Sequence, residues 1–146
     1  MSIPTLTLYN HQRTQQVNRK WIEKIARSAM PACLAAAKSP EAPLLTLEEI
    51  EVSIVSDKRM TQVHADFLDD ATPTDVITFH HGEILVSADT AKRQGAEHGQ
   101  TMDRELALYI VHGLLHLAGW NDECPDEQQE MHRLQDSILS SVDPVA

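Results

Sequence analysis

The sequence has few cysteines and no long apolar run. Only Cys33 and Cys124 occur among its 146 residues, too few for the disulfide framework that stabilises many small secreted proteins. No stretch approaches the roughly 18 consecutive apolar residues of a membrane-spanning helix. Residues 1–16 lack the charged and then apolar pattern of a signal peptide. We therefore expect a cytoplasmic protein of a reducing compartment, with no membrane partner.

Basic residues are also scarce. Twelve Lys and Arg face 22 Asp and Glu, and the net charge is −10. Residues 1–60 hold eight basic and six acidic side chains, whereas residues 61–146 hold four and sixteen. The chain as a whole therefore lacks the basic footprint of a typical nucleic-acid-binding protein. A polyanion would have to be bound locally, by a metal or by the one basic stripe, formed by Lys20, Lys24 and Arg27. Most stripes of this kind are simply solvated helix faces.

Hydrophobic periodicity predicts the order β-α-β-α-β-β-α-α-α. The predicted strands cover 3–8, 44–55, 75–79 and 83–86. The first three predicted helices cover 16–30, 58–68 and 87–94. Thr101 is expected to cap a central helix, and Pro125 is expected to open the last one. Pro31 is expected to end or kink the first helix. We find no repeat or linker, so 1–146 is treated as a single domain. The order favours an α+β fold in which helices cover a small mixed sheet of about four strands.

The most informative segment runs from His112 to Asp122. Two histidines at i and i+4 share one face of a helix, with Cβ atoms about 5–6 Å apart. Gly119 can adopt the left-handed conformation that ends a helix, and Asp122 can then fold back toward His112 and His116. This spacing predicts a three-ligand metal site with one position left for a water that zinc would activate. The alternative is that the histidines are a partly buried core pair or a surface pair.

Several neighbouring residues leave other interpretations open. Cys124 is a possible soft ligand in place of an ordinary loop cysteine, and Glu123 is a possible base in place of a surface carboxylate. Gly113 occupies the position that carries the general base in H-E-x-x-H proteases, which argues against a conventional peptidase, and its small size would leave space beside a metal. We expect His80 and His81 to lie in a turn.

Three motifs resemble the YbeY family of bacterial endoribonucleases and rRNA maturation factors. The family pattern H-G-x-L-H-L-x-G-[YF]-D-H corresponds to 112–122, with Asp122 in place of the third histidine. The family's T-[DN]-V-L-S-F strand corresponds to 74–79, and its G-[DE]-I-x-I-S strand to 82–87. The order and spacing agree from about residue 50 to the C-terminus.

The resemblance implies a zincin-like α+β fold and one zinc ion per chain. It also implies a single-strand-specific endoribonuclease that matures the 3′ end of 16S rRNA, takes part in ribosome quality control, and has the ribosome or a ribosomal protein as partner. His112, His116 and Asp122 would hold the metal, and Asp122 could broaden its selectivity toward other divalent transition metals. No general base is assigned, and Lys20, Lys24 and Arg27 are the candidate RNA contacts. A zinc metallopeptidase and a non-catalytic ribosome-assembly factor with a structural metal are the alternatives.

Overall fold

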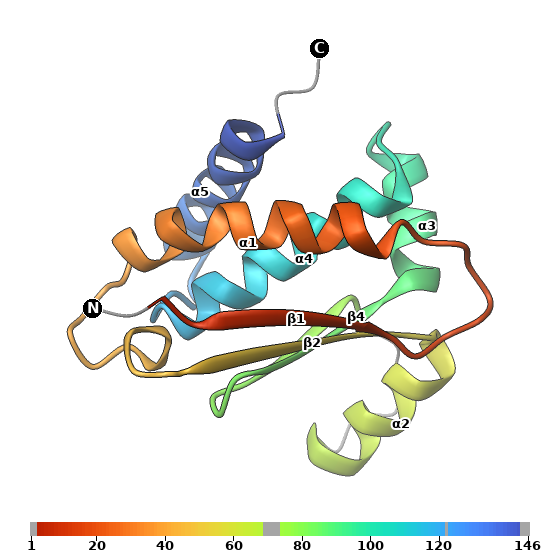
Figure 1. Cartoon of the computed structure of the whole chain (residues 1–146), viewed down its shortest axis with the longest axis horizontal. Coiled ribbons are helices and arrows are strands. Elements are labelled where there is room, and N and C mark those ends of the chain that lie inside the picture. The colour runs from red at the N-terminus through yellow and green to blue at the C-terminus, as the bar shows by residue number, and fades with distance from the viewer. Residues whose placement is uncertain (1–2, 69–73, 122, 144–146) are drawn as a thin grey trace.

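The computed structural model describes residues 3–68, 74–121 and 123–143 (Figure 1). Its elements have the predicted order, and the α+β class is confirmed. The strands are β1 (Thr5–Asn10), β2 (Glu49–Val55), β3 (Val76–Phe79) and β4 (Glu83–Ser87). The helices are α1 (Arg19–Ala35), α2 (Asp57–Leu68), α3 (Ala88–Glu97), α4 (Met102–Leu117) and α5 (Pro125–Val142), with a 3₁₀ turn at Pro43–Leu45. None of the described helices is both long and apolar enough to cross a bilayer.

The four strands form one mixed sheet in the order β1-β2-β4-β3. The β1–β2 and β2–β4 pairs are parallel, whereas β3 runs antiparallel to β4. Gly82 makes the predicted turn between β3 and β4 with φ at +107°. An ideal Cβ at this position would also lie 2.7 Å from the Glu49 carbonyl oxygen, so both its conformation and its surroundings favour glycine.

Helices α1, α4 and α5 lie on one side of the sheet, and α2 lies on the other (Figure 1). Helix α4 is central, because it packs against α1, α3, α5 and strands β3 and β4. The main core consists of fully buried aliphatic side chains from the sheet and from α1 and α4, among them Leu6, Leu8, Ile50, Ile54, Ile22, Ile84, Ile110 and Leu114. Burial of this apolar surface fixes the height of α4 above the sheet.

Two predicted boundaries were wrong. Helix α1 does not stop at Pro31 but continues to Ala35, because Cys33, on the turn after Pro31, is fully buried in the core and holds that turn in place. The strand expected from residue 44 begins at Glu49 instead. Pro43 opens a 3₁₀ turn there, and this turn buries Leu44.

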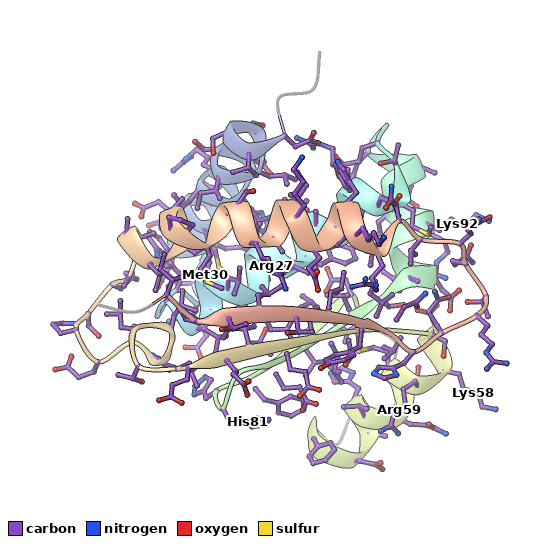
Figure 2. All side chains as sticks on the ribbon, in the orientation of Figure 1. Arg27, Met30, Lys58, Arg59, His81 and Lys92 are labelled. Carbon is purple, nitrogen blue, oxygen red and sulfur yellow. The ribbon has the colours of Figure 1, made fainter. Side chains whose placement is uncertain are left out.

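The outer edge of β1 is covered by charged side chains from α1. Glu23 accepts a hydrogen bond from the Leu8 N–H at 2.9 Å, and Arg27 Nε donates to the Leu6 carbonyl at 2.9 Å. Arg27 is seen between α1 and β1 in Figure 2. Arg19 also donates to the Leu8 carbonyl and pairs with Glu23. These contacts satisfy the backbone groups that an edge strand would otherwise leave open for pairing with another chain.

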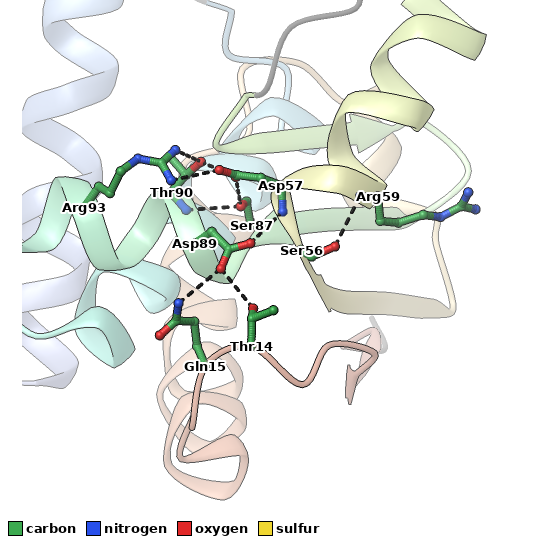
Figure 3. A network of polar contacts seen from close by, with 9 residues as sticks. All are labelled: Thr14, Gln15, Ser56, Asp57, Arg59, Ser87, Asp89, Thr90 and Arg93. Carbon is green, nitrogen blue, oxygen red and sulfur yellow. Dashed lines mark hydrogen bonds and ion pairs between the residues drawn. The ribbon is translucent and has the colours of Figure 1, made fainter.

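A second polar network joins the starts of α2 and α3 (Figure 3). Asp57 accepts hydrogen bonds from Ser87 at 2.5 Å and Thr90 at 2.7 Å, and pairs with Arg93 at 2.8 Å. Asp89 accepts from the Asp57 N–H at 2.8 Å and, on its other side, from Thr14 and Gln15. The network therefore ties α2, α3 and the loop after β1 together at one end of the sheet.

Candidate metal site on helix α4

Helix α4 begins at its predicted cap and packs directly on the sheet at Gly113. The Thr101 hydroxyl accepts the Arg104 N–H at 3.1 Å, as expected for an N-cap residue. An ideal Cβ on Gly113 would lie only 3.0 Å from Ile84 Cγ2 and 3.0 Å from Thr78 Oγ1. Gly113 therefore allows the close packing of α4 on β3 and β4. It points into the sheet, so its small size does not clear space for a substrate, and a glutamate there would meet Ile84.

The two predicted histidines come together on the other side of this helix turn. His112 Nε2 and His116 Nε2 lie 3.0 Å apart, with their rings nearly perpendicular at 81°. Both side chains are half-buried. The i, i+4 spacing thus brings two nitrogen donors to one point, as the sequence predicted.

Each of the other ring nitrogens contacts an oxygen atom. His116 Nδ1 lies 3.0 Å from the Trp120 backbone carbonyl oxygen, and His112 Nδ1 lies 2.7 Å from Gln135 Oε1. Both oxygens are hydrogen-bond acceptors, which favours the tautomer with the proton on Nδ1 in each ring. In that tautomer the two Nε2 lone pairs face one another 3.0 Å apart, an arrangement that a cation bound between them would stabilise.

The carbonyl that orients His116 is itself held in place. Gly119 reverses the chain with φ at +99°, as predicted, and the Trp120 N–H donates to the Leu115 carbonyl at 3.0 Å. The Trp120 indole N–H donates to the Ala36 carbonyl at 2.9 Å, and the Lys38 ammonium lies 4.6 Å from the centre of the Trp120 ring. The end of α4 is therefore fixed against the end of α1.

Two cavities meet at the histidine pair. One, of 270 Å³, is lined by residues of β3 and its flanks together with both histidines: Thr74, Asp75, Val76, Thr78, His80, His112 and His116. The other, of 590 Å³, extends from His112 between the C-terminal part of α3, α4 and α5. Asp75 and His112 line both cavities. The histidines thus lie where a ligand could extend in two directions.

The larger cavity is polar, and its groups are mostly paired with one another. Glu105 is buried at 1 % exposure and contacts Gln100 and His98. The Tyr109 hydroxyl donates to Gln94 at 2.7 Å. Burial, together with the Glu105 charge, raises the pKa of Tyr109, so that residue remains a hydrogen-bond donor at neutral pH.

The structure places the remaining predicted residues as follows. Asp122 lies outside the described residues. Cys124 is exposed and is the N-cap residue of α5, and the exposed Glu123 donates its N–H to the Asn121 side chain. His80 lines the smaller cavity, whereas His81 contacts Glu83 and stacks on Phe79.

The basic stripe lies apart from the histidine pair. Lys20 and Lys24 are exposed on α1, and Arg27 is engaged with Leu6 and Glu23. Among the described residues that line the two cavities, none belongs to this stripe.

Sequence reasoning missed two groups that orient the histidines. Trp120 acts through its backbone carbonyl, which no side-chain pattern can reveal. Gln135 left a signal, because it is a polar residue in the apolar stripe of the last helix, between Met131 and Ile138. All three of these α5 residues are buried.

The pair suits a transition metal. Two imidazole nitrogens bound to one tetrahedral zinc at about 2.0–2.1 Å would be about 3.3 Å apart, close to the 3.0 Å seen here. In metal sites the second nitrogen of a ligating histidine almost always donates to an oxygen, and in both of these residues Nδ1 lies at hydrogen-bonding distance from an oxygen. Within the ranges the structure describes, no group of three or more candidate ligands comes together, and the predicted third ligand, Asp122, falls outside those ranges.

Comparison with known proteins gives this arrangement a context. The sequence model described as endoribonuclease YbeY matches residues 7–143. The chain belongs to the endoribonuclease YbeY family. It is 33 % identical over 117 residues to the endoribonuclease YbeY of Frankia casuarinae, covering 66 % of this chain but only 58 % of that relative. It is 32 % identical over 120 residues to that of a Parafrankia species, covering 68 % of this chain and 76 % of the relative.

A solved structure supports the fold independently of the YbeY sequences. The solution structure of TM1509 from Thermotoga maritima is similar to this chain with a TM-score of 0.63. The similarity covers 94 % of this chain and 89 % of that protein, at 20 % sequence identity. At this identity the likeness is one of fold alone.

Proposed function

We propose that this protein is a metal-dependent endoribonuclease that cleaves single-stranded RNA. The observation that carries the proposal is the pair of Nε2 atoms 3.0 Å apart, with both Nδ1 atoms oriented by oxygen acceptors, at the junction of two cavities. Membership of the endoribonuclease YbeY family supports the choice of RNA as substrate. Zinc is the metal proposed, and His112, His116 and Asp122 are the proposed ligands.

The residues of this site would divide the work of hydrolysis. A divalent metal in such a site polarises a phosphoryl oxygen and supplies a nucleophile from water at neutral pH. His112 and His116 would hold it, Gln135 and the Trp120 carbonyl would orient the two rings, and Asp75 would face a substrate entering either cavity. One cavity would hold the RNA strand on one side of the scissile phosphate, and the other cavity would hold it on the other side.

The test is cleavage of a labelled single-stranded RNA. We expect cleavage by the purified protein, its loss after chelation and its return with added zinc. His116→Ala should abolish cleavage while leaving the circular dichroism spectrum unchanged. The matched control is His81→Ala, because the His81 side chain is 71 % exposed and lines neither cavity. Cleavage by His116→Ala at the wild-type rate, or cleavage that survives chelation, would contradict the proposal.

We further propose that the substrate is the 3′ region of 16S rRNA, matured or checked for quality on ribosomal particles in the cytoplasm. The family supports rRNA as substrate, and the net charge of −10 favours RNA that a ribosomal particle or ribosomal protein presents to the site. Faster cleavage on assembled small subunits than on the same RNA alone would support this partner. Equal rates on both would contradict it.

A further inference from the structure

Gln135 is an unusual residue for its position. It lies on the inner side of α5 with an exposure of 8 %, in an apolar stripe with the buried Met131 and Ile138. A buried polar side chain needs a hydrogen-bond partner to offset its lost hydration. Its Oε1 atom lies 2.7 Å from His112 Nδ1, across the interface between α5 and α4.

This contact decides which nitrogen of His112 carries the proton. A neutral imidazole has one N–H and one lone pair, and the partner of one nitrogen fixes the role of the other. With the amide oxygen as acceptor, the proton is on Nδ1 and the lone pair is on Nε2, which faces His116. If the amide nitrogen donated instead, the proton would move to Nε2 and would occupy the position of a metal.

We propose that Gln135 is a positioning residue that holds His112 in the Nδ1–H tautomer and so keeps Nε2 available to bind the metal. This inference rests on the proposed function, because it assigns Gln135 a role toward the same metal site. His116 receives the equivalent orientation from the Trp120 carbonyl, an acceptor that cannot be reversed. Rotation of the Gln135 amide would exchange its oxygen and nitrogen atoms. Its buried packing between α4 and α5 is therefore needed to keep the oxygen toward His112.

Gln135 is uncharged, and this affects the net charge of the proposed metal site. Many ligating histidines donate to a carboxylate, which makes the ligand more basic. An amide oxygen fixes the same tautomer without adding a negative charge, so the positive charge of the metal stays less compensated. A less compensated cation suits an anionic phosphodiester substrate.

Three variants separate the role of the acceptor from that of packing. Gln135→Met keeps a long unbranched side chain but removes the amide oxygen. Gln135→Glu restores an oxygen acceptor for the Nδ1 proton. Ser137→Ala is the matched control, because Ser137 is exposed on α5 and is not among the residues that line the two cavities.

The first measurement is the imidazole ¹⁵N spectrum of the metal-free protein, at one pH well above the usual histidine value of about 6.5. We expect the His112 spectrum of the Nδ1–H tautomer in the wild type, Gln135→Glu and Ser137→Ala. In Gln135→Met the proton should be shared between the two nitrogens. An Nε2–H His112 in the wild type would overturn the proposal, and this result is available even if Gln135→Met does not fold.

The second measurement is zinc affinity, determined by competition with a chromophoric chelator. Loss of an outer-sphere partner typically weakens metal binding by roughly 10- to 100-fold, and this is the loss expected for Gln135→Met. Gln135→Glu should bind zinc at least as tightly as the wild type, and Ser137→Ala should match the wild type. Wild-type affinity in a folded Gln135→Met would overturn the proposal. Failure of the wild type to bind zinc would instead contradict the proposed metal site, while the ¹⁵N spectrum would still decide the tautomer.

Discussion

Gly113 of α4 packs directly against Ile84 of β4, where an ideal Cβ on Gly113 would lie 3.0 Å from Ile84 Cγ2 and 3.1 Å from Ile84 Cδ1. Glycine to alanine in a helix interior normally gains about 0.5–1 kcal/mol. Here we expect Gly113→Ala to destabilise the protein by about 1–3 kcal/mol, because the added methyl group overpacks the core. Urea denaturation of the two proteins measures the difference.

A partner substitution tests the cause of that loss. Ile84→Val removes Cδ1 and should recover part of the stability lost in Gly113→Ala, so the two changes should be non-additive. Additive effects would show that the contact with Ile84 Cδ1 is not the source of the loss.

The network at Asp57 predicts a particular dependence of stability on pH. Burial alone would raise the pKa of Asp57, but hydrogen bonds from Ser87 and Thr90 and the Arg93 charge outweigh burial and lower it below its ordinary value of 3.8. The pKa of Asp89 is also lowered, since the Asp57 N–H, Gln15 and Thr14 outweigh its burial. Because the folded pKa values lie below the unfolded ones, this stabilisation is present above about pH 4 and is lost as the pH falls through the folded values.

Asp57→Asn should therefore cost about 1–3 kcal/mol at pH 7 and progressively less as the pH falls below 4. Chemical denaturation at several pH values in this range measures whether the free energies of unfolding of the wild type and Asp57→Asn converge. Asp66→Asn, at an exposed position on the same helix, should keep the wild-type pH dependence. A loss at Asp57 that is the same at every pH would contradict the assignment of the network.

The edge of β1 offers a test of the Glu23 contact. Glu23→Ala leaves the Leu8 N–H without its acceptor, and the expected loss is about 1–3 kcal/mol. Glu23→Gln keeps an acceptor and should lose less. Lys24→Ala, at the next and exposed position, should change the free energy of unfolding by less than about 0.5 kcal/mol. Equal losses in Glu23→Ala and Lys24→Ala would show that the backbone contact contributes nothing.

The basic stripe can be tested as an RNA-binding surface. If Lys20 and Lys24 contact phosphates, the double change to Glu should weaken binding of a single-stranded RNA and reduce its dependence on salt. Fluorescence anisotropy at several salt concentrations measures both quantities. Because Arg27 is engaged with Leu6 and Glu23, its contribution should be smaller than that of either lysine. Unchanged binding in the double variant would remove the stripe from the RNA-binding surface.

Local sequence patterns predicted those features of the histidine site that depend on residues close together in the sequence. The i, i+4 spacing placed His112 and His116 together, and Gly119 correctly predicted the turn that brings the Trp120 carbonyl back to His116. Both features depend on neighbouring residues of one helix and its end, where backbone geometry is nearly fixed.

The remaining features depend on how distant elements pack. Gln135 is 23 residues from His112 and reaches it only because α5 packs across α4. Pro31 was expected to end or kink α1, but the helix continues to Ala35, because burial of Cys33 in the core outweighed the local preference for an end. Gly113 was interpreted as a gap beside the metal, whereas its neighbours Ile84 and Thr78 come from the sheet. A single sequence does not encode these contacts in any local pattern.

Every role assigned to this site depends on a metal held by His112 and His116. The most direct test is the metal content of protein purified without added metal, for the wild type, the double variant His112→Ala/His116→Ala, and Asp122→Ala. We predict about one zinc or related divalent ion per chain in the wild type, none in the double variant and a reduced content in Asp122→Ala. A wild-type metal content in the folded double variant would contradict the account.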